Sequence, residues 1–163
     1  MAACLAFVQK SWAATIAKGG HDCNVLSSLT FIHARPGHLR ASLKIDQIHV
    51  NNHNTIHGGV ILALTDTLTS LAISTMGYHP TGVSVNASTE FVRPGGRSGD
   101  ELIGVGEVVK LGKSLAYTRI TFYDPQGRVV AFGSHTKHLG AATAVVKFSS
   151  DGEREEPVRS AKL

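Results

Sequence analysis

The middle of this sequence has almost no charge. Between Asp46 and Glu90, Asp66 is the single Asp, Glu, Lys or Arg side chain. A carboxylate in a long apolar stretch is costly unless other groups hold it, so Asp66 is the first candidate for a functional residue. The stretch is not expected to insert stably in a membrane, because hydroxyl side chains and Asp66 interrupt its apolar run.

The sequence also has few cysteines and no dense run of basic residues. The 163 residues include two cysteines, Cys4 and Cys23, in no CxxC or zinc-binding pattern, so a reducing intracellular compartment is the default. The net charge is +4 without a dense Lys/Arg run, which argues against a nucleic-acid partner and suits a small anionic ligand. The apolar content of 42% and charged content of 17% indicate one globular domain with a real core.

Two helices are predicted. Residues 1–24 form an N-terminal helix and linker, because apolar residues recur at helical spacing before "GG". A weak mitochondrial presequence is the alternative, but that segment lacks the arginines that such presequences usually carry. From Gly58 to about Met76 apolar residues cover nearly all faces, which predicts a buried helix that stops at Gly77.

Six strands are predicted around this helix. Two alternating runs within residues 25–47, joined by "RPG", form a hairpin. Four more runs, joined by short links, predict adjacent antiparallel strands at 82–92, 101–110, 114–123 and 128–139. Residues 25–140 therefore form one α+β domain with an antiparallel sheet around a long central helix, whose remaining face a second copy should cover. Residues 141–163 are expected to be a polar, mobile tail.

Two short segments resemble known functional motifs but do not match them. "LGKS" is not a P-loop, because the pattern requires glycine at position 107 and the sequence has Glu107. "GVSVN" is not a nucleophile elbow, because it leads from a helix into a strand.

The histidines do not form a predicted metal site. Those at positions 49, 53 and 57 are spaced by four, but they lie in an Asn-rich loop with no carboxylate alongside. His135 and His138 point to opposite faces of one strand, so at most one of them belongs to any given site.

"HGG" directly precedes the central helix. The backbone N–H groups of a first helical turn have no intrahelical partner, lie at the positive end of the helix dipole and can stabilise an oxyanion. A plain flexible helix start is at least as good an explanation of this motif alone. Asp66 lies eight residues after Gly58, about 12 Å along the helix, so one chain cannot easily aim both at one carbonyl. In a two-fold dimer with antiparallel central helices, Asp66 can face the Gly58 end of the partner.

Four segments together resemble a known family: "NNHNTIHGGVILALTDTLTSLAI", "GVSVNASTEFVRPG", "KLGKSLAYT" and "GSHTKHLG". They are similar to hotdog-fold acyl-CoA thioesterases of the PaaI-like group, and most of all to the eukaryotic thioesterase superfamily member two type. The resemblance spans about residues 25–140. It implies a hotdog fold, homodimers assembled into homotetramers, and hydrolysis of medium- to long-chain fatty acyl-CoA to free acid and CoA, with no cofactor besides the substrate's own CoA and no metal.

The resemblance also implies roles for residues. Asp66 activates the attacking water, Gly58 offers its N–H to the thioester oxygen, Asn51 orients the thioester or the water, Ser84 holds the water, and His57 holds the loop. The CoA moiety is expected to contact Phe91, Val92, Arg93, Pro94, Gly95, Gly96, Lys110, Leu111, Gly112, Lys113, Ser114, Leu115 and His138.

Two other functions stay open. One is a non-catalytic acyl-CoA-binding hotdog protein, which would need neither Asp66 nor Ser84. The other is a hotdog dehydratase or hydratase, which usually needs a His–acid pair, for which the sequence offers only His57. The terminal "AKL" differs from the peroxisomal signal S-K-L by one small residue, so a peroxisomal location is expected, with cytosolic or mitochondrial locations as alternatives.

Overall fold

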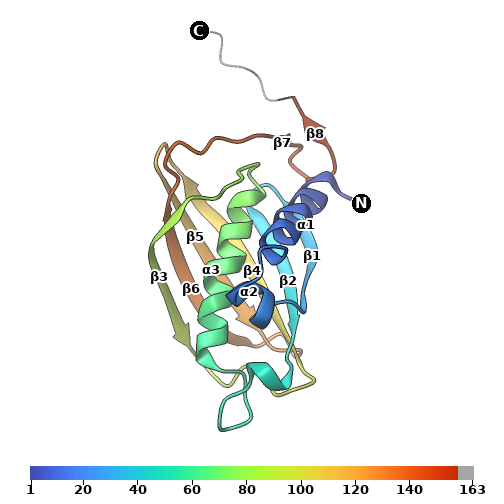
Figure 1. The fold of residues 1–163 in the computed structure, drawn as a ribbon, viewed down its shortest axis with the longest axis vertical. Helices are drawn as coiled ribbons and strands as arrows, with labels where there is room; N and C mark the ends of the chain where they lie inside the picture. The colour runs from blue at the N-terminus through green and yellow to red at the C-terminus, as the bar shows by residue number, and fades with distance from the viewer. Residues whose placement is uncertain (158–163) are drawn as a thin grey trace.

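The computed structural model describes residues 1–157, which form a six-stranded antiparallel sheet wrapped around one long helix (Figure 1). The elements are α1 (Ala3–Ile16), α2 (His21–Val25), β1 (Leu29–Arg35), β2 (His38–Lys44), the 3-10 helix η1 (Gln47–His49), α3 (Gly58–Ser74), β3 (Val83–Phe91), β4 (Glu101–Leu111), β5 (Leu115–Tyr123), β6 (Val129–His138), β7 (Lys147–Phe148) and β8 (Glu155–Glu156).

The strands lie in the order β1-β2-β4-β5-β6-β3, and each neighbouring pair is antiparallel. Helix α3 packs against strands β2 to β6. The predicted α+β class, with an antiparallel sheet around a central helix, is therefore confirmed. The "RPG" hairpin and the start of α3 are also as predicted, since β1 and β2 pair across this turn and α3 begins at Gly58. The helix ends at Ser74, two residues before the predicted end near Met76.

The predicted position of β3 in the sheet is wrong. The short link predicted that β3 pairs with β4, but β3 pairs with β6 and forms an edge of the sheet. The link 92–100 can extend to about 30 Å, whereas three strand spacings take about 14 Å, so it can cross the end of the sheet. Backbone hydrogen bonds hold it there, among them Ile56 N–H to Gly96 O at 2.9 Å and Gly99 N–H to Ile45 O at 2.8 Å.

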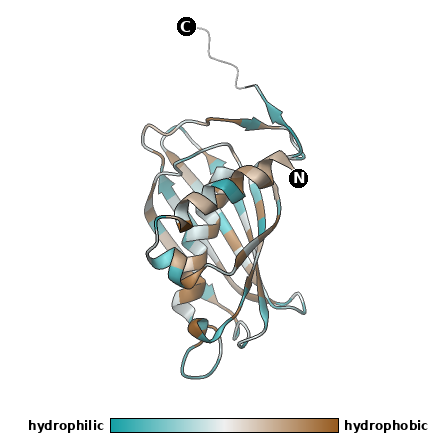
Figure 2. Cartoon of the chain, turned by 45° about the vertical axis from the view of Figure 1, so that its right-hand side comes forward, coloured by the Kyte–Doolittle hydropathy of each residue, from teal (hydrophilic) through white to brown (hydrophobic). Residues whose placement is uncertain are grey.

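Helix α3 is buried along most of its surface, as its apolar composition requires. Its first turn is capped by His57, whose Nδ1 accepts a hydrogen bond from Gly59 N–H at 2.8 Å. Gly59, Leu62 and Asp66 are exposed, and their spacing of three and four places them on one stripe. Figure 2 shows hydrophobic and hydrophilic residues alternating along the strands that pack on this helix. The core is therefore closed except along the exposed stripe.

Helix α1 lies over β1 and beside α3 (Figure 1). The segment after residue 140 also packs here: Phe148 is buried and meets Phe7 edge-on at 5.6 Å between ring centroids, and Cys4 N–H donates to Gly152 O. The polar tail expected from the sequence thus contains the β7–β8 hairpin. Within residues 1–157, no helix combines the length and the apolar character that a membrane crossing requires.

Candidate active site

Asp66 and Ser84 lie together at the exposed stripe of α3. Ser84, near the start of β3, has its Oγ 3.4 Å from Asp66 Oδ1 in the same chain. The side chain of Asp66 is 57% exposed in a single chain, although the stretch of sequence around it is largely apolar. The carboxylate is open to water and to any molecule that covers this stripe.

His135, on the inward face of β6, contacts this pair from the interior of the protein. Its ring is fully buried, with Nε2 2.9 Å from Ser84 Oγ and Nδ1 2.7 Å from Thr69 Oγ1. The Thr69 hydroxyl donates to the Thr65 carbonyl oxygen at 2.6 Å, so it accepts a hydrogen bond from Nδ1–H of His135. This network assigns the Nδ1–H tautomer and leaves Nε2 as an acceptor for Ser84. Burial lowers the pKa of His135 below its ordinary value. The negative charge of Asp66 opposes this decrease, whereas the positive charge of Lys137 lowers the pKa further. The ring is therefore neutral near pH 7.

His135 also corrects one sequence-based argument. From the sequence, only His57 was expected to join a His–acid pair, but His135 Nε2 lies 3.6 Å from Asp66 Oδ1. His135 was missed because it and Asp66 come from segments far apart in the chain. His135 is nevertheless covered completely, so Ser84 and Asp66 stand between its ring and any substrate.

Lys137 is a second functional candidate that was not predicted from the sequence. It follows His135 by two residues on β6 and shares its inward face. Its side chain is buried, and its Nζ donates to Ser70 Oγ at 2.6 Å and to Thr81 Oγ1 at 3.4 Å. Burial lowers the pKa of Lys137, and the charge of Asp66 opposes this shift. The available signal was two basic residues at alternate positions of a strand, both on the face that packs against the helix.

Gly58 begins α3 at the other end of the exposed stripe. No hydrogen bond from its N–H is found among the described residues, whereas the following N–H groups of Gly59 and Val60 donate to His57. A Cβ at Gly58 would lie 3.3 Å from the ring of Phe91, so this side chain closely covers the helix start. The free N–H is available to an anionic oxygen at the positive end of the helix.

The side chains of Asn51 and His49 hold the loop that leads to His57, the N-cap of α3. The amide oxygen of Asn51 accepts hydrogen bonds from His53 N–H, Thr55 N–H and the Thr55 hydroxyl. His49 is buried and takes part in a capping box with Asp46, while its Nε2 lies 2.6 Å from Val25 O. Asn51 and His49 therefore make hydrogen bonds that stabilise the conformation of this loop. Among residues 1–157 no group of three His, Cys, Asp or Glu is arranged to hold a metal ion.

The predicted CoA-binding residues form two groups at opposite ends of the β3–β6 pair. Phe91 is paired with Ala131, whereas Val83 is paired with His138, and a nine-residue strand spans about 26 Å. The Lys110–Leu115 hairpin joins His138, since Leu115 pairs with that histidine. The Phe91–Gly96 group lies at the Gly58 end instead. One chain therefore brings the hairpin and His138 together near Ser84 but leaves the other group apart.

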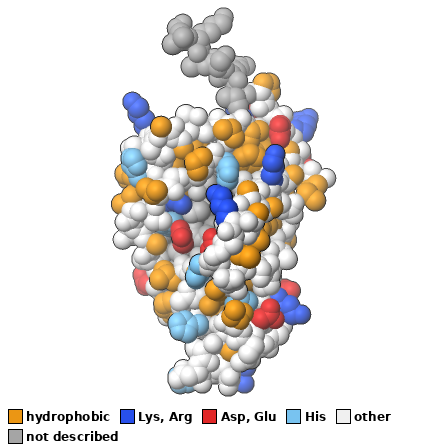
Figure 3. All heavy atoms as spheres, viewed as in Figure 1, with side chains coloured by type: hydrophobic (Ala, Val, Ile, Leu, Met, Phe, Trp, Pro, Cys, Tyr) orange, Lys and Arg blue, Asp and Glu red, His pale blue; other side chains and the backbone are white. Residues whose placement is uncertain are grey.

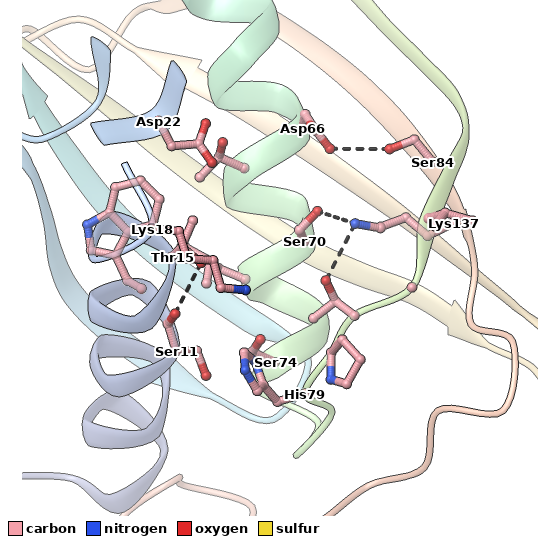
Figure 4. A pocket seen from close by; sticks show the side chains of 17 residues that line it. Ser11, Thr15, Lys18, Asp22, Asp66, Ser70, Ser74, His79, Ser84 and Lys137 are labelled. Carbon is pink, nitrogen blue, oxygen red and sulfur yellow. Dashed lines mark hydrogen bonds between the residues drawn. The ribbon is translucent and has the colours of Figure 1, made fainter. Parts of the chain in front are cut away.

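A cavity of about 410 Å³ opens beside Asp66 and runs between α1 and α3 (Figure 4). A second hollow adjoins Asp66 on its other side and is lined by Gly59, Leu62, Ala63 and Ala87 among others. Figure 3 shows acidic and basic side chains gathered near the middle of this face of the molecule. Asp66 and Ser84 line both spaces, so a substrate held at this pair could extend into either.

A long helix wrapped by a six-stranded antiparallel sheet is the architecture of the hotdog class of proteins. A family model described as the thioesterase superfamily matches residues 53–131. Acyl-coenzyme A thioesterase 13 of Homo sapiens is 32% identical over 117 residues, which cover 71% of this chain and 83% of the human protein. The chain belongs to the thioesterase superfamily.

Solved structures agree with this assignment. Thioesterase superfamily member 2 of zebrafish superposes with a TM-score of 0.75 at 29% identity, covering 83% of this chain and 98% of that one. The Escherichia coli PaaI protein superposes with a TM-score of 0.68 at 24% identity, covering 84% of this chain and 98% of its own, which shows the shared fold. The resemblance stated from the sequence is therefore confirmed at the level of fold and family.

Proposed function

We propose that this protein is an acyl-CoA thioesterase, which hydrolyses acyl-CoA to a free acid and CoA. The observation that carries the proposal is the position of Asp66 on the exposed stripe of α3, with Ser84 Oγ 3.4 Å from its carboxylate. A general base must reach the proton that it abstracts and must be open to the reacting water, and this carboxylate is exposed with the Ser84 hydroxyl beside it. The relationship to acyl-coenzyme A thioesterase 13 supplies the substrate class.

The chemistry that follows uses four residues. Asp66 takes a proton from a water that Ser84 helps to hold, and the oxygen of that water attacks the thioester carbonyl carbon. The carbonyl oxygen becomes an oxyanion, which the N–H of Gly58 stabilises. When the tetrahedral intermediate collapses, the carbon–sulfur bond breaks and Asp66 returns the proton to the departing CoA thiolate. His135 acts through Ser84 by fixing the direction of its hydroxyl.

This mechanism requires two chains. Gly58 and Asp66 are separated by eight residues of helix, about 12 Å, so they cannot contact one carbonyl in the same chain. A two-fold axis near Leu62, with the α3 helices antiparallel, places the Gly58 of one chain opposite the Asp66 of the other. It also brings the Phe91–Gly96 group of one chain towards the Lys110–Leu115 hairpin and His138 of the partner, which would complete a CoA rim. Pairing of such dimers into a homotetramer remains a prediction.

The competing function is non-catalytic binding of acyl-CoA. It gives no reason for a base, a hydroxyl and a buried histidine to be linked at an exposed stripe. A dehydratase is disfavoured because His135, the histidine that forms a close pair with Asp66, is fully buried and cannot reach a substrate carbon. Catalysis by Asp66 accounts for all three side chains.

Thiol release tests this function directly. Wild-type protein, Asp66→Ala and Asp66→Asn are compared on acyl-CoAs of short, medium and long chain. Loss of the base should lower kcat by about 10²- to 10⁴-fold in both variants. Equal, slow release of CoA by all three proteins on every substrate would show that Asp66 is not a catalytic base. The same panel tests the predicted preference for medium- to long-chain fatty acyl groups.

A peroxisomal location is part of the proposal and rests on the "AKL" terminus, which lies outside the described residues. A fusion at the C-terminus hides this signal, whereas a fusion at the N-terminus leaves it free. We expect the N-terminal fusion to enter peroxisomes and the C-terminal fusion to stay outside. The same distribution of both fusions would remove the localisation claim and leave the enzymatic proposal untouched.

A further inference from the structure

The cavity between α1 and α3 has an unusual lining for a site that would hold a plain alkyl chain. Hydroxyl groups and two lysines share its walls with apolar residues such as Trp12 and Leu71, and Figure 4 shows how α1, α3, the segment before β3 and Lys137 of β6 contribute to the lining. The polar residues of the lining are Ser11, Thr15, Lys18, Asp22, Asp66, Thr67, Ser70, Ser74, His79, Thr81, Ser84 and Lys137. Such walls cost free energy when they face hydrocarbon without a hydrogen-bonding partner.

Lys137 is the strongest of these groups. Its side chain is 6% exposed, and its Nζ has two hydroxyl partners, Ser70 and Thr81, although an ammonium group offers three donors. No ion pair within residues 1–157 includes this lysine. A buried cation without a paired anion is costly, so an anionic group that enters the cavity would be stabilised there.

Ser74 is an independent sign of a missing ligand. Its residue is 1% exposed, and its Oγ has no hydrogen-bond partner within the described part of the chain. Buried hydroxyls are almost always paired, so an unpaired one that lines a cavity calls for a partner inside that cavity. Ser70 and Ser74 follow Asp66 at intervals of four residues, so all three lie on one face of α3.

These intervals set the length of the ligand. Ser70 and the attached Lys137 Nζ lie one turn beyond Asp66, about 6 Å along the helix. An extended chain advances about 1.2 Å per bond, so about five bonds separate a thioester carbon at Asp66 from a group at this level. Ser74 lies one turn further along α3, so a carboxylate placed between the two levels requires up to about three more bonds. The hollow on the other side of Asp66, which contains Leu62, is the one that the proposed two-fold partner would cover.

We propose that this cavity binds the acyl group and selects acyl chains that end in a carboxylate, with Lys137, Ser70 and Ser74 as the distal subsite. This inference rests on the proposed thioesterase function and names its substrate class: acyl-CoAs of dicarboxylic acids with about six to eight carbons, in place of the medium- to long-chain fatty acyl groups that the resemblance predicts. The ω-carboxylate accepts hydrogen bonds from Lys137 Nζ and from the Ser74 hydroxyl. The oxidation reactions that convert an ω-methyl group to a carboxylate, followed by CoA ligation, would supply such substrates.

A matched pair of substrates tests the subsite. Adipoyl-CoA and hexanoyl-CoA have the same six-carbon chain and differ in the terminal carboxylate. We expect the wild-type kcat/KM to be at least about tenfold higher for adipoyl-CoA, and we expect Ser74→Ala and Lys137→Met each to reduce this ratio by about tenfold. Lys44→Met, an exposed lysine on β2 outside the cavity, serves as the control that keeps the wild-type ratio.

The variants and a binding measurement separate the possible failures. Ser74→Ala removes one unpaired oxygen and should fold normally, so it carries the test if Lys137→Met does not fold. Calorimetric titration with free adipate and hexanoate measures the subsite without turnover, and adipate should bind more tightly to wild type than to Ser74→Ala. A preference for hexanoyl-CoA, or a ratio that neither variant changes, would overturn the subsite while the thioesterase function stands. Absence of hydrolysis of every acyl-CoA, with adipate still bound, would instead overturn the function.

Discussion

Ser84 carries one hydroxyl proton, and two acceptors lie within its reach. His135 Nε2 is at 2.9 Å and Asp66 Oδ1 at 3.4 Å. While His135 is neutral with its proton on Nδ1, Ser84 donates to Nε2 and Asp66 stays free to engage water. When His135 is protonated, Nε2–H donates to Ser84 and the Ser84 proton turns to Asp66. The protonation state of the buried His135 ring thus determines whether Ser84 donates its hydrogen bond to His135 or to Asp66.

A pH dependence of stability follows from the same residue. Burial lowers the pKa of His135 below its ordinary value of 6.5, against the opposing effect of Asp66. Between that lowered value and 6.5 the unfolded chain binds more protons than the folded one, so stability is complete above about pH 6.5 and falls as the pH decreases. We expect His135→Gln to flatten this decline, measured by urea unfolding at about pH 7.5 and about pH 5.

His138 provides the matched control. It lies three residues further along β6, and its side chain is exposed on the other face. His138→Gln should keep the wild-type difference in unfolding free energy between the two pH values. If His135→Gln also keeps it, the acid sensitivity of the fold arises elsewhere.

At the scale of elements, β3 and α3 share one open side. β3 is an edge strand, and it exposes the large apolar side chains of Val83, Val85 and Phe91. Leu62 on α3 is 43% exposed on the stripe that carries Asp66. Exposed apolar residues beside an unpaired strand edge are typical of a surface that another chain covers.

Leu62→Glu tests this surface. Two copies of residue 62 would meet near the two-fold axis, so the substitution should weaken the dimer by about 3 kcal/mol or more and lower activity in parallel. The fold should persist, because the side chain is already partly exposed. Light scattering after size-exclusion chromatography gives the mass, and circular dichroism verifies the fold. Val145→Glu, at an exposed apolar residue after β6, is the control that should keep mass and activity. A Leu62→Glu dimer with full activity would contradict the proposed interface.

The elements also show where sequence reasoning succeeds. Local patterns were sufficient for α3, for the β1–β2 hairpin and for the β4-β5-β6 run, since each depends on periodicity or on a short turn. The pairing of β3 with β6 was out of reach, because the link 92–100 is long enough for several neighbours. Asp66 was detected as an isolated charge. Lys137 was not, because its burial depends on Ser70 and Thr81, which are distant in sequence.

At the scale of the whole molecule, the shared site can be tested by removing one N–H. Gly58 is the first residue of α3, where proline is well tolerated, and His57 has φ −67° and ψ 135°, which suit a residue before proline. Gly58→Pro therefore removes the N–H while it preserves the helix. Gly58→Ala is the matched control: its Cβ meets Phe91 in the same way but it keeps the N–H, so it should retain more activity than Gly58→Pro.

Mixing of two inactive variants then tests whether each site draws on two chains. In a heterodimer of Gly58→Pro and Asp66→Asn, one site combines the intact Asp66 of the first chain with the intact Gly58 of the second, and the other site has neither. Random reassociation after unfolding and refolding makes half of the dimers mixed, so activity should recover to about a quarter of wild type. Unmixed samples refolded in the same way provide the baseline. Sites built within single chains would give no recovery, because every chain in the mixture carries one defect.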